Sequence, residues 1–154
     1  MRIMTRQEIE QRIPHRPPMR LIDAIVSRES ARIVCRKSFL EDEFFFRGHF
    51  PGQPIVPGVI QCECCLQAGA VLLSDQGSAE AGPPGLPVAT RMDGVKFKRI
   101  VRPGDTVEID VTLKDRVSNA FYMTGKVTLD GKLATRLDFA CSLMAGEAGG
   151  ESQS

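Results

Sequence analysis

The sequence predicts an α+β fold, in which a curved antiparallel β-sheet wraps around one long central α-helix. Residues 57–75 form a long apolar segment, and its apolar side chains lie nearly all round the predicted helix, so other elements must enclose it. From residue 88 onward the apolar residues recur with a period of two, which is typical of strands. Turn sequences such as Asp130-Gly131 join these strands, which favours hairpins and leaves no room for crossover helices.

Each further element has its own signal in the chain. Thr5 and Glu8 fit a capping box and predict a short N-terminal helix that ends before Pro14. The long helix is expected to begin at Pro57, because proline is favoured at the first helical position. The predicted strands are residues 19–27, 31–39, 88–101, 105–117, 120–129 and 132–144. The last four strands are predicted to form an antiparallel meander, and a sheet of this kind around a long apolar helix is the hot-dog arrangement.

Size and composition indicate a single domain of an ordinary globular protein. The chain has 154 residues, of which 42% are hydrophobic and 25% charged, with a net charge of +1. This charge implies no overall attraction to nucleic acid or membranes, and we expect a cytoplasmic protein because no apolar run resembles a signal peptide or a membrane span. We predict one domain over residues 1–145, a surface loop at 76–87 and a disordered tail at 146–154.

The five cysteines are interpreted as reduced packing residues. Their number is odd, and three of them, Cys62, Cys64 and Cys65, lie on the predicted long helix. Cys64 points away from the edge that the other two share, so the three thiols cannot converge on one metal ion. We therefore expect no metal site there and small apolar packing side chains instead.

Glu63 is the acidic residue inside the apolar helix, and a carboxylate in such a place costs free energy unless something uses it. It is either an ion stabilised by the nearby helix N-terminus or by a partner subunit, or a general acid whose pKa is raised by apolar surroundings. Gln67 lies one turn later on the same face and can orient it. His49, on a loop fixed by Gly48 and a Pro/Gly turn, is the candidate base, although a lone loop histidine is often only a surface residue.

Gly58 is the candidate for a third function at the start of the helix. Its backbone N–H is free at a helix N-terminus, where the dipole favours negative charge, and the missing side chain lets a ligand approach. A thioester carbonyl that becomes enolate-like would be stabilised at this position, with Pro57 and Val59 supporting it. A base, an acid and an oxyanion donor are what proton abstraction next to a thioester requires.

These residues carry a resemblance to the 3-hydroxyacyl-[acyl-carrier-protein] dehydratases of the FabZ type. The family pattern GHFPxxPxMPGVLxxE stands in this chain as GHFPGQPIVPGVIQCE at residues 48–63, with the same fourteen-residue step from His49 to Glu63. Residues 13–16 resemble the family's PHR segment, residues 21–23 its LVD strand, and residues 93–105 its strand and turn before PGD. The likeness covers most of residues 8–144.

The resemblance implies a hot-dog dimer, commonly a trimer of dimers, with active sites shared between subunits. It implies that His49 of one chain removes the α-proton of a 3-hydroxyacyl thioester, and that Glu63 of the other chain protonates the departing hydroxyl. Gly58 would bind the carbonyl, and no metal or organic cofactor is expected. Glu63 also favours the dehydratase over the related dehydratase/isomerase, which has aspartate there. The chain differs from the family pattern at Val56 and at Cys64-Cys65, positions that shape the acyl tunnel.

The expected partner is an acidic acyl carrier protein holding a phosphopantetheine-linked acyl chain. A basic run made of Lys96, Lys98, Arg99 and Arg102 could receive it. The equally weighted alternative is a solvated strand face, because Lys96 and Lys98 alternate with apolar residues as an exposed edge would.

Two other functions on the same fold remain open at this point. The first is an acyl-thioester hydrolase in which Glu63 activates water, and the intact spacing from His49 to Glu63 argues against it. The second is a catalytically silent acyl-binding paralogue, which would gain nothing from a carboxylate in an apolar helix.

Overall fold

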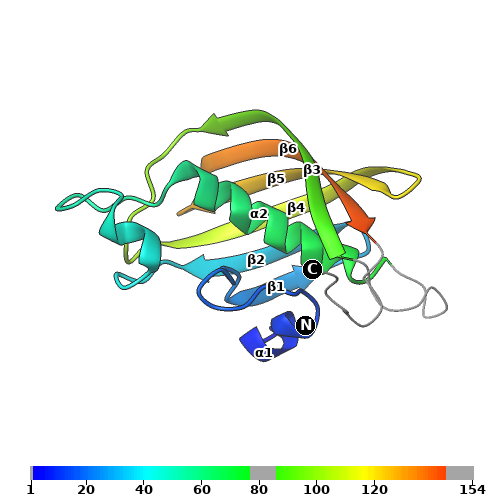
Figure 1. The fold of residues 1–154 in the computed structure, drawn as a ribbon, viewed down its shortest axis with the longest axis horizontal. Coiled ribbons are helices and arrows are strands. Elements are labelled where there is room, and N and C mark those ends of the chain that lie inside the picture. The colour runs from blue at the N-terminus through cyan, green and yellow to red at the C-terminus, as the bar shows by residue number, and fades with distance from the viewer. Residues whose placement is uncertain (1, 77–85, 145–154) are drawn as a thin grey trace, which may run out of the picture.

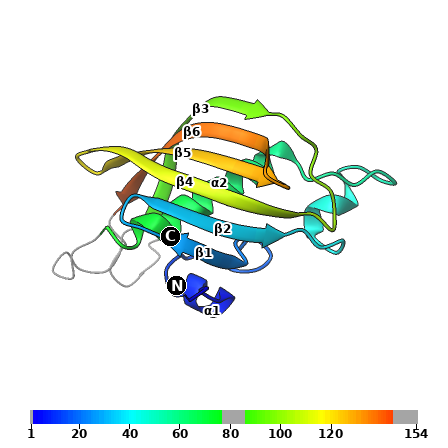
Figure 2. The ribbon, with the colours of Figure 1, turned by 180° about the vertical axis from the view of Figure 1, so that it is seen from behind.

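The computed structural model describes residues 2–76 and 86–144, and these form one antiparallel sheet around one main helix (Figure 1). The elements in chain order are α1 (Arg6–Glu10), β1 (Ala24–Arg28), β2 (Arg32–Ser38), the 3-10 helix η1 (Phe44–Arg47), α2 (Gly58–Leu73), β3 (Leu86–Phe97), β4 (Thr106–Val117), β5 (Ala120–Leu129) and β6 (Lys132–Met144). The strand order is β1-β2-β4-β5-β6-β3, and the sheet curves around α2 without closing (Figures 1 and 2). The predicted hot-dog fold is confirmed.

Helix α2 fills the concave side of the sheet, as its apolar composition predicts. Most of its side chains from Gln61 onward are buried, and only a stripe near its N-terminal half stays accessible, with Val59 71% exposed. The helix lies directly on β5 because Gly125 has no side chain there. A Cβ atom at Gly125 would lie 2.8 Å from Cβ of Cys65 and 2.9 Å from its Sγ. The backbone of β5 thus lies close against the Cys65 side chain of the helix.

The predicted four-strand meander is wrong at its first strand. β3 pairs with β6 and lies at the edge, whereas β2 occupies the place beside β4. The reason is the linker between β3 and β4, which crosses the molecule and does not turn back on itself. Val101 is fully buried in this linker and accepts a 2.8 Å hydrogen bond from the Val56 N–H, and Asp105 accepts one of 2.9 Å from Phe39 N–H. The Arg102–Asp105 turn therefore ends a crossover.

The other boundaries agree with the sequence to different degrees. β5 and β6 have the predicted bounds, and the capping box of α1 is present, with Thr5 N–H donating to Glu8 Oε2 at 2.8 Å. The first predicted strand is wrong over residues 19–23, which are irregular and contact α2, and the strand at 88–101 ends already at Phe97. The long helix is predicted to begin at Pro57, but α2 begins one residue later at Gly58, with Pro57 at the N-cap position. Most of the predicted loop, 77–85, and the predicted tail lie outside the described residues.

All five cysteines are buried as free thiols, which agrees with their interpretation as packing residues. Burial raises the pKa of the Cys35 thiol to about 12 and that of Cys141 to about 11, and it also raises the pKa values of the three helical thiols. These groups hold their protons at neutral pH and are poor nucleophiles.

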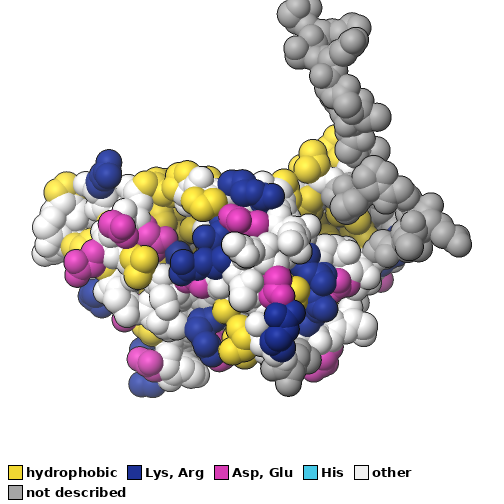
Figure 3. Space-filling view, turned by 90° about the horizontal axis from the view of Figure 1, so that it is seen from below, with side chains coloured by type: hydrophobic (Ala, Val, Ile, Leu, Met, Phe, Trp, Pro, Cys, Tyr) yellow, Lys and Arg dark blue, Asp and Glu magenta, His cyan; other side chains and the backbone are white. Residues whose placement is uncertain are grey.

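The outer surface carries mixed charges on one face (Figure 3) and exposed apolar side chains along the edge strand β3. On the face seen from below, basic and acidic side chains lie beside one another and no single sign dominates (Figure 3). The edge strand β3 is different, because almost all of it is exposed, including the apolar side chains of Leu86, Val88, Met92 and Phe97. Within residues 2–76 and 86–144, no helix has the length and apolar character needed to cross a bilayer.

Candidate active site

His49 is held on the loop between η1 and α2 by a reciprocal pair of contacts with Ile55. Its ring nitrogen Nδ1 lies 3.0 Å from the Ile55 carbonyl oxygen, and the Ile55 N–H donates back to the His49 carbonyl at 3.0 Å. Because a carbonyl only accepts, Nδ1 carries the proton of the neutral ring, and Nε2 is left with a free lone pair. The ring also stacks on Phe50 at 4.1 Å between centroids. This is the tautomer that a general base needs.

A hollow of about 340 Å³ brings His49 together with the start of α2. Its walls include Pro57, Gly58 and Val59, the three residues that the sequence places around the carbonyl site, together with the ring of Phe97. Gly58 has no room for a side chain, because a Cβ atom there would lie 2.6 Å from Cε1 of Phe97. As the first residue of α2, Gly58 has no acceptor for its N–H inside the helix. Gly58 and His49 thus line the same hollow.

Glu63 lies elsewhere on α2 and is oriented by Gln67. The Gln67 Nε2 group donates to Glu63 Oε1 at 3.1 Å. Gln67 is itself fully buried and fixed at both ends, since its Nε2 donates to the Met19 carbonyl at 2.7 Å and its Oε1 accepts from the Leu21 N–H at 2.8 Å. The carboxyl group therefore has a defined direction, set by the irregular segment before β1.

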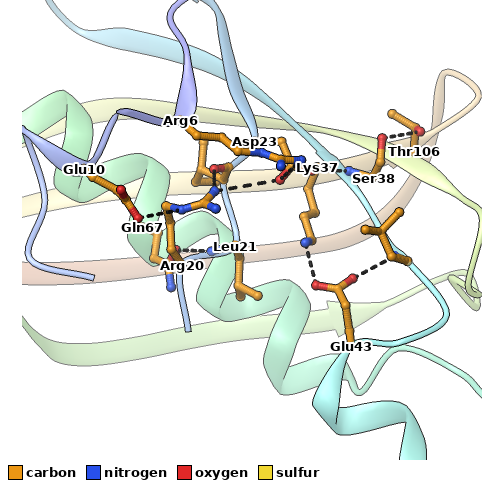
Figure 4. Close-up of polar contacts among 12 residues, drawn as sticks. Arg6, Glu10, Arg20, Leu21, Asp23, Lys37, Ser38, Glu43, Gln67 and Thr106 are labelled. Atoms are coloured by element: carbon orange, nitrogen blue, oxygen red, sulfur yellow. Dashed lines mark hydrogen bonds and ion pairs between the residues drawn. The ribbon is translucent and has the colours of Figure 1, made fainter. Parts of the chain in front are cut away.

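That irregular segment is held in place by charged and polar contacts on its other side (Figure 4). Arg20 pairs with Glu10 at 3.1 Å and donates to the Ile22 carbonyl at 2.9 Å. Asp23 accepts a 2.8 Å hydrogen bond from the Ser38 N–H, which ties the segment to the end of β2. These contacts fix the backbone that positions Gln67, and through it Glu63.

His15 also lies against Glu63, a contact that the sequence analysis missed. Its Nε2 atom is 3.7 Å from Glu63 Oε1, and each side chain is 25% exposed. The only sequence signal for this contact was the likeness of residues 13–16 to the family's PHR segment, which says nothing of where the ring points.

The described chain does not bring His49 and Glu63 into one hollow. Glu63 is not among the residues that line the hollow of His49 and Gly58. In the described chain, His49 and Gly58 therefore line one hollow, and the oriented Glu63 carboxyl group lies outside it.

Two of the four basic candidates line hollows beside the start of α2. Arg99 lines that hollow, and Arg102 lines a larger one of about 660 Å³. The two hollows share Ile55 and Ile100 and are therefore adjacent. Lys96 and Lys98, both exposed, line neither of these two hollows in the described chain.

Within the described ranges, no group of three His, Cys, Asp or Glu side chains is placed to bind a metal ion.

Comparison with known proteins places this chain in a class. The chain matches the model of the FabA-like domain over residues 13–138. Among solved structures, the dehydratase heterocomplex ApeI:P from Xenorhabdus doucetiae superposes with a TM-score of 0.73 at 15% identity, covering 88% of this chain and 90% of that one. A putative thioesterase from Ralstonia eutropha superposes with a TM-score of 0.62 at 16% identity over 77% of this chain and 83% of its own. At these identities the superpositions show the fold alone.

Relatives found by sequence identify the family more narrowly than these superpositions do. The chain is 41% identical over 139 residues to the 3-hydroxyacyl-[acyl-carrier-protein] dehydratase FabZ of Oenococcus oeni, covering 88% of this chain and 96% of that protein. It is 43% identical over 136 residues to the FabZ of Latilactobacillus sakei, covering 83% and 90%. The chain therefore belongs to the FabA-like family and, within it, to the FabZ-type 3-hydroxyacyl-[acyl-carrier-protein] dehydratases.

Proposed function

We propose that this protein dehydrates 3-hydroxyacyl thioesters of acyl carrier protein to trans-2-enoyl thioesters in fatty-acid synthesis or a related lipid or polyketide pathway. The observation that carries the proposal is the hollow that joins the free Nε2 of His49 to the backbone N–H of Gly58. The FabZ relatives favour this activity over thioester hydrolysis and over a silent acyl-binding function.

The proposed reaction moves one proton to His49 and one from Glu63. His49 Nε2 removes the α-proton, and the electron pair of that C–H bond moves toward the thioester carbonyl, whose oxygen the Gly58 N–H stabilises. The Cα–Cβ double bond then forms as the C–O bond at Cβ breaks. Glu63 gives its proton to the departing hydroxyl, which leaves as water. His49 then returns its proton to solvent, and Glu63 takes one up.

A complete site on this proposal needs two chains, with His49 from one and Glu63 from the other. The edge strand β3 supports such a homodimer, because it exposes a long apolar row of side chains and its outer edge is unpaired within the described residues. We propose that this edge forms the dimer interface and that three dimers associate. Val59, exposed beside the hollow, would then be covered by the second chain.

The carrier protein is proposed to dock at the basic residues that border the two adjacent hollows. Arg99 and Arg102 have the positions that support this role, and Lys96 and Lys98 extend the positive charge along β3 and the linker. No cofactor takes part in the proposed reaction, and the place of action is proposed to be the cytoplasm.

An enoyl-thioester assay tests the activity. Crotonyl and longer enoyl thioesters are supplied, and loss of the double bond is followed together with release of free thiol. The wild type is expected to hydrate the double bond without releasing thiol. Thiol release without hydration would contradict the dehydratase proposal. His49→Ala and Glu63→Gln are each expected to abolish hydration while the size of the assembly stays unchanged, and near-normal activity in either variant contradicts its assigned role.

Charge reversal separates docking from chemistry. Arg99→Glu and Arg102→Glu are expected to raise KM for the carrier-bound substrate and to leave a small thioester analogue nearly unaffected. Lys96→Glu and Lys98→Glu serve as the comparison, with smaller effects expected because these residues border neither hollow. Equal effects on both substrates count against docking at this surface.

A further inference from the structure

The chain has two histidines, and His15 is the one without a role in the reaction as proposed. It lies in the segment between α1 and β1, and its Nε2 atom faces Glu63 Oε1 at 3.7 Å. The residues that follow in this segment are fixed, because Gln67 forms hydrogen bonds with the backbone of Met19 and Leu21. The approach of His15 to Glu63 is therefore a fixed feature of the fold.

The surroundings of the ring decide which nitrogen of His15 carries the proton. Nδ1 is buried and has no hydrogen-bond partner among the described residues. A proton on Nδ1 would be a buried N–H without an acceptor, at a cost of about 1–3 kcal/mol, whereas a proton on Nε2 faces the Glu63 carboxyl oxygen. The neutral ring therefore carries its proton on Nε2, the atom that points at the Glu63 carboxyl group.

The two groups that approach Glu63 meet at the same oxygen. Gln67 Nε2 donates to Oε1 at 3.1 Å, and His15 Nε2 approaches that atom as well. Oε1 accepts one hydrogen bond, from Gln67, and has His15 Nε2 3.7 Å away, so the acidic proton of Glu63 belongs on Oε2. The Oε2–H group is then the one free to face the substrate hydroxyl.

We propose that His15 is a positioning residue that, with Gln67, holds Glu63 Oε1 as an acceptor so that Oε2 delivers the proton to the leaving hydroxyl. The inference rests on the proposed function, because it assigns His15 a part in orienting the acid of that reaction. When Glu63 has given up its proton, the Nε2–H of His15 also stabilises the negative charge left on the carboxylate.

Two substitutions at His15 separate hydrogen bonding from packing. In His15→Gln the amide nitrogen reaches the place of Nε2, whereas in His15→Asn it reaches only the place of Nδ1. We expect kcat of His15→Asn to fall about 10- to 100-fold, because the variant lacks the N–H group that faces the negative charge left on Glu63, with KM nearly unchanged. His15→Gln should recover most of the loss. Equal impairment of both variants, or wild-type kcat in His15→Asn, overturns the positioning role.

A spectroscopic measurement tests the contact without relying on turnover. The chain has two histidines, so ¹⁵N-histidine labelling gives two imidazole rings to assign, and His49→Ala identifies them. Opposite tautomers are expected, with the proton on Nε2 in His15 and on Nδ1 in His49. Glu63→Gln should shift the Nε2 resonance of His15.

The two measurements distinguish the two proposals. A wild type that fails to dehydrate but shows the Nε2–H tautomer coupled to Glu63 overturns the proposed function and supports the contact. The inference is overturned if the wild type is active but His15 carries its proton on Nδ1. It is also overturned if the Nε2 resonance of His15 does not shift in Glu63→Gln. Either result leaves the dehydratase proposal standing.

Discussion

At the scale of single residues, the candidate site depends on groups whose neighbours leave them one possible state. His49 is held with Nε2 free because Nδ1 meets a carbonyl oxygen. A side chain at Gly58 would displace the Phe97 ring, which occupies that space. Burial raises the pKa of the thiols and keeps them protonated at neutral pH.

Gly58→Ala tests how closely Phe97 covers the start of α2. The added methyl group would lie 2.6 Å from the Phe97 ring, so the half-exposed ring must move out of its place in the hollow. We expect kcat/KM for enoyl hydration to fall about 10-fold or more, while the free energy of unfolding changes by less than about 1 kcal/mol because alanine suits a helix better than glycine.

The double variant Gly58→Ala/Phe97→Ala is the matched control for this prediction, with Phe97→Ala alone as its reference. Removal of the ring relieves the clash, so the alanine at position 58 should then change activity little. An unchanged penalty in the double variant would mean that the clash is not the cause.

The buried Cys35 thiol predicts how stability depends on alkaline pH. Burial raises its pKa from the usual 9.0 to about 12. Below about pH 9 both folded and unfolded chains hold this proton; above it the unfolded chain loses the proton first, so the free energy of unfolding falls by up to about 1.4 kcal/mol per pH unit. In urea unfolding, the stability advantage of the wild type over Cys35→Ala should narrow between pH 8 and 10.5, and a constant difference would contradict the assignment.

At the scale of elements, α2 and the sheet fit together through a few close contacts. The helix is apolar nearly all round, yet its position over the sheet depends on the bare backbone of β5 at Gly125. The segment before β1 is another such element, since it is neither helix nor strand and still fixes Gln67 by both of its polar atoms.

Gly125→Ala tests the contact between α2 and β5. The new Cβ would lie 2.8 Å from Cβ of Cys65 and 3.3 Å from the Phe139 ring, in the packed core. We expect a loss of about 1–3 kcal/mol in the free energy of unfolding, the usual penalty for overpacking. Gly48→Ala is the control, because its Cβ meets nothing within 4 Å and its φ of −115° suits alanine. Similar losses in both variants would argue against a specific contact.

At the scale of the whole molecule, the described chain holds the two halves of the proposed site apart. His49 and Gly58 share one hollow, and Glu63 faces His15 and Gln67 outside it. The exposed edge of β3 is the surface that we propose for the second chain.

Mixing two inactive variants tests whether sites are shared. A dimer of one His49→Ala chain and one Glu63→Gln chain has one site with both changes and one site with neither. Unfolding and refolding an equimolar mixture should therefore restore about a quarter of the wild-type activity, since half the dimers are mixed and each has one intact site. No recovery, with mixed dimers demonstrated by differential tagging, would mean that each site uses one chain.

The sequence alone determined the fold class, the pairing of β5 with β6, and the identity of the candidate residues. These follow from local signals: periodicity, a two-residue turn at Asp130-Gly131, and the step from His49 to Glu63. Only the tertiary structure decided that β3 lies beside β6, because the course of the 98–105 linker depends on contacts with Val56 and Phe39 that no local pattern encodes. It also decided which atoms surround the candidate groups. The tautomer of His49 and the approach of His15 to Glu63 arise between segments distant in the sequence, and side-chain direction there is set by packing.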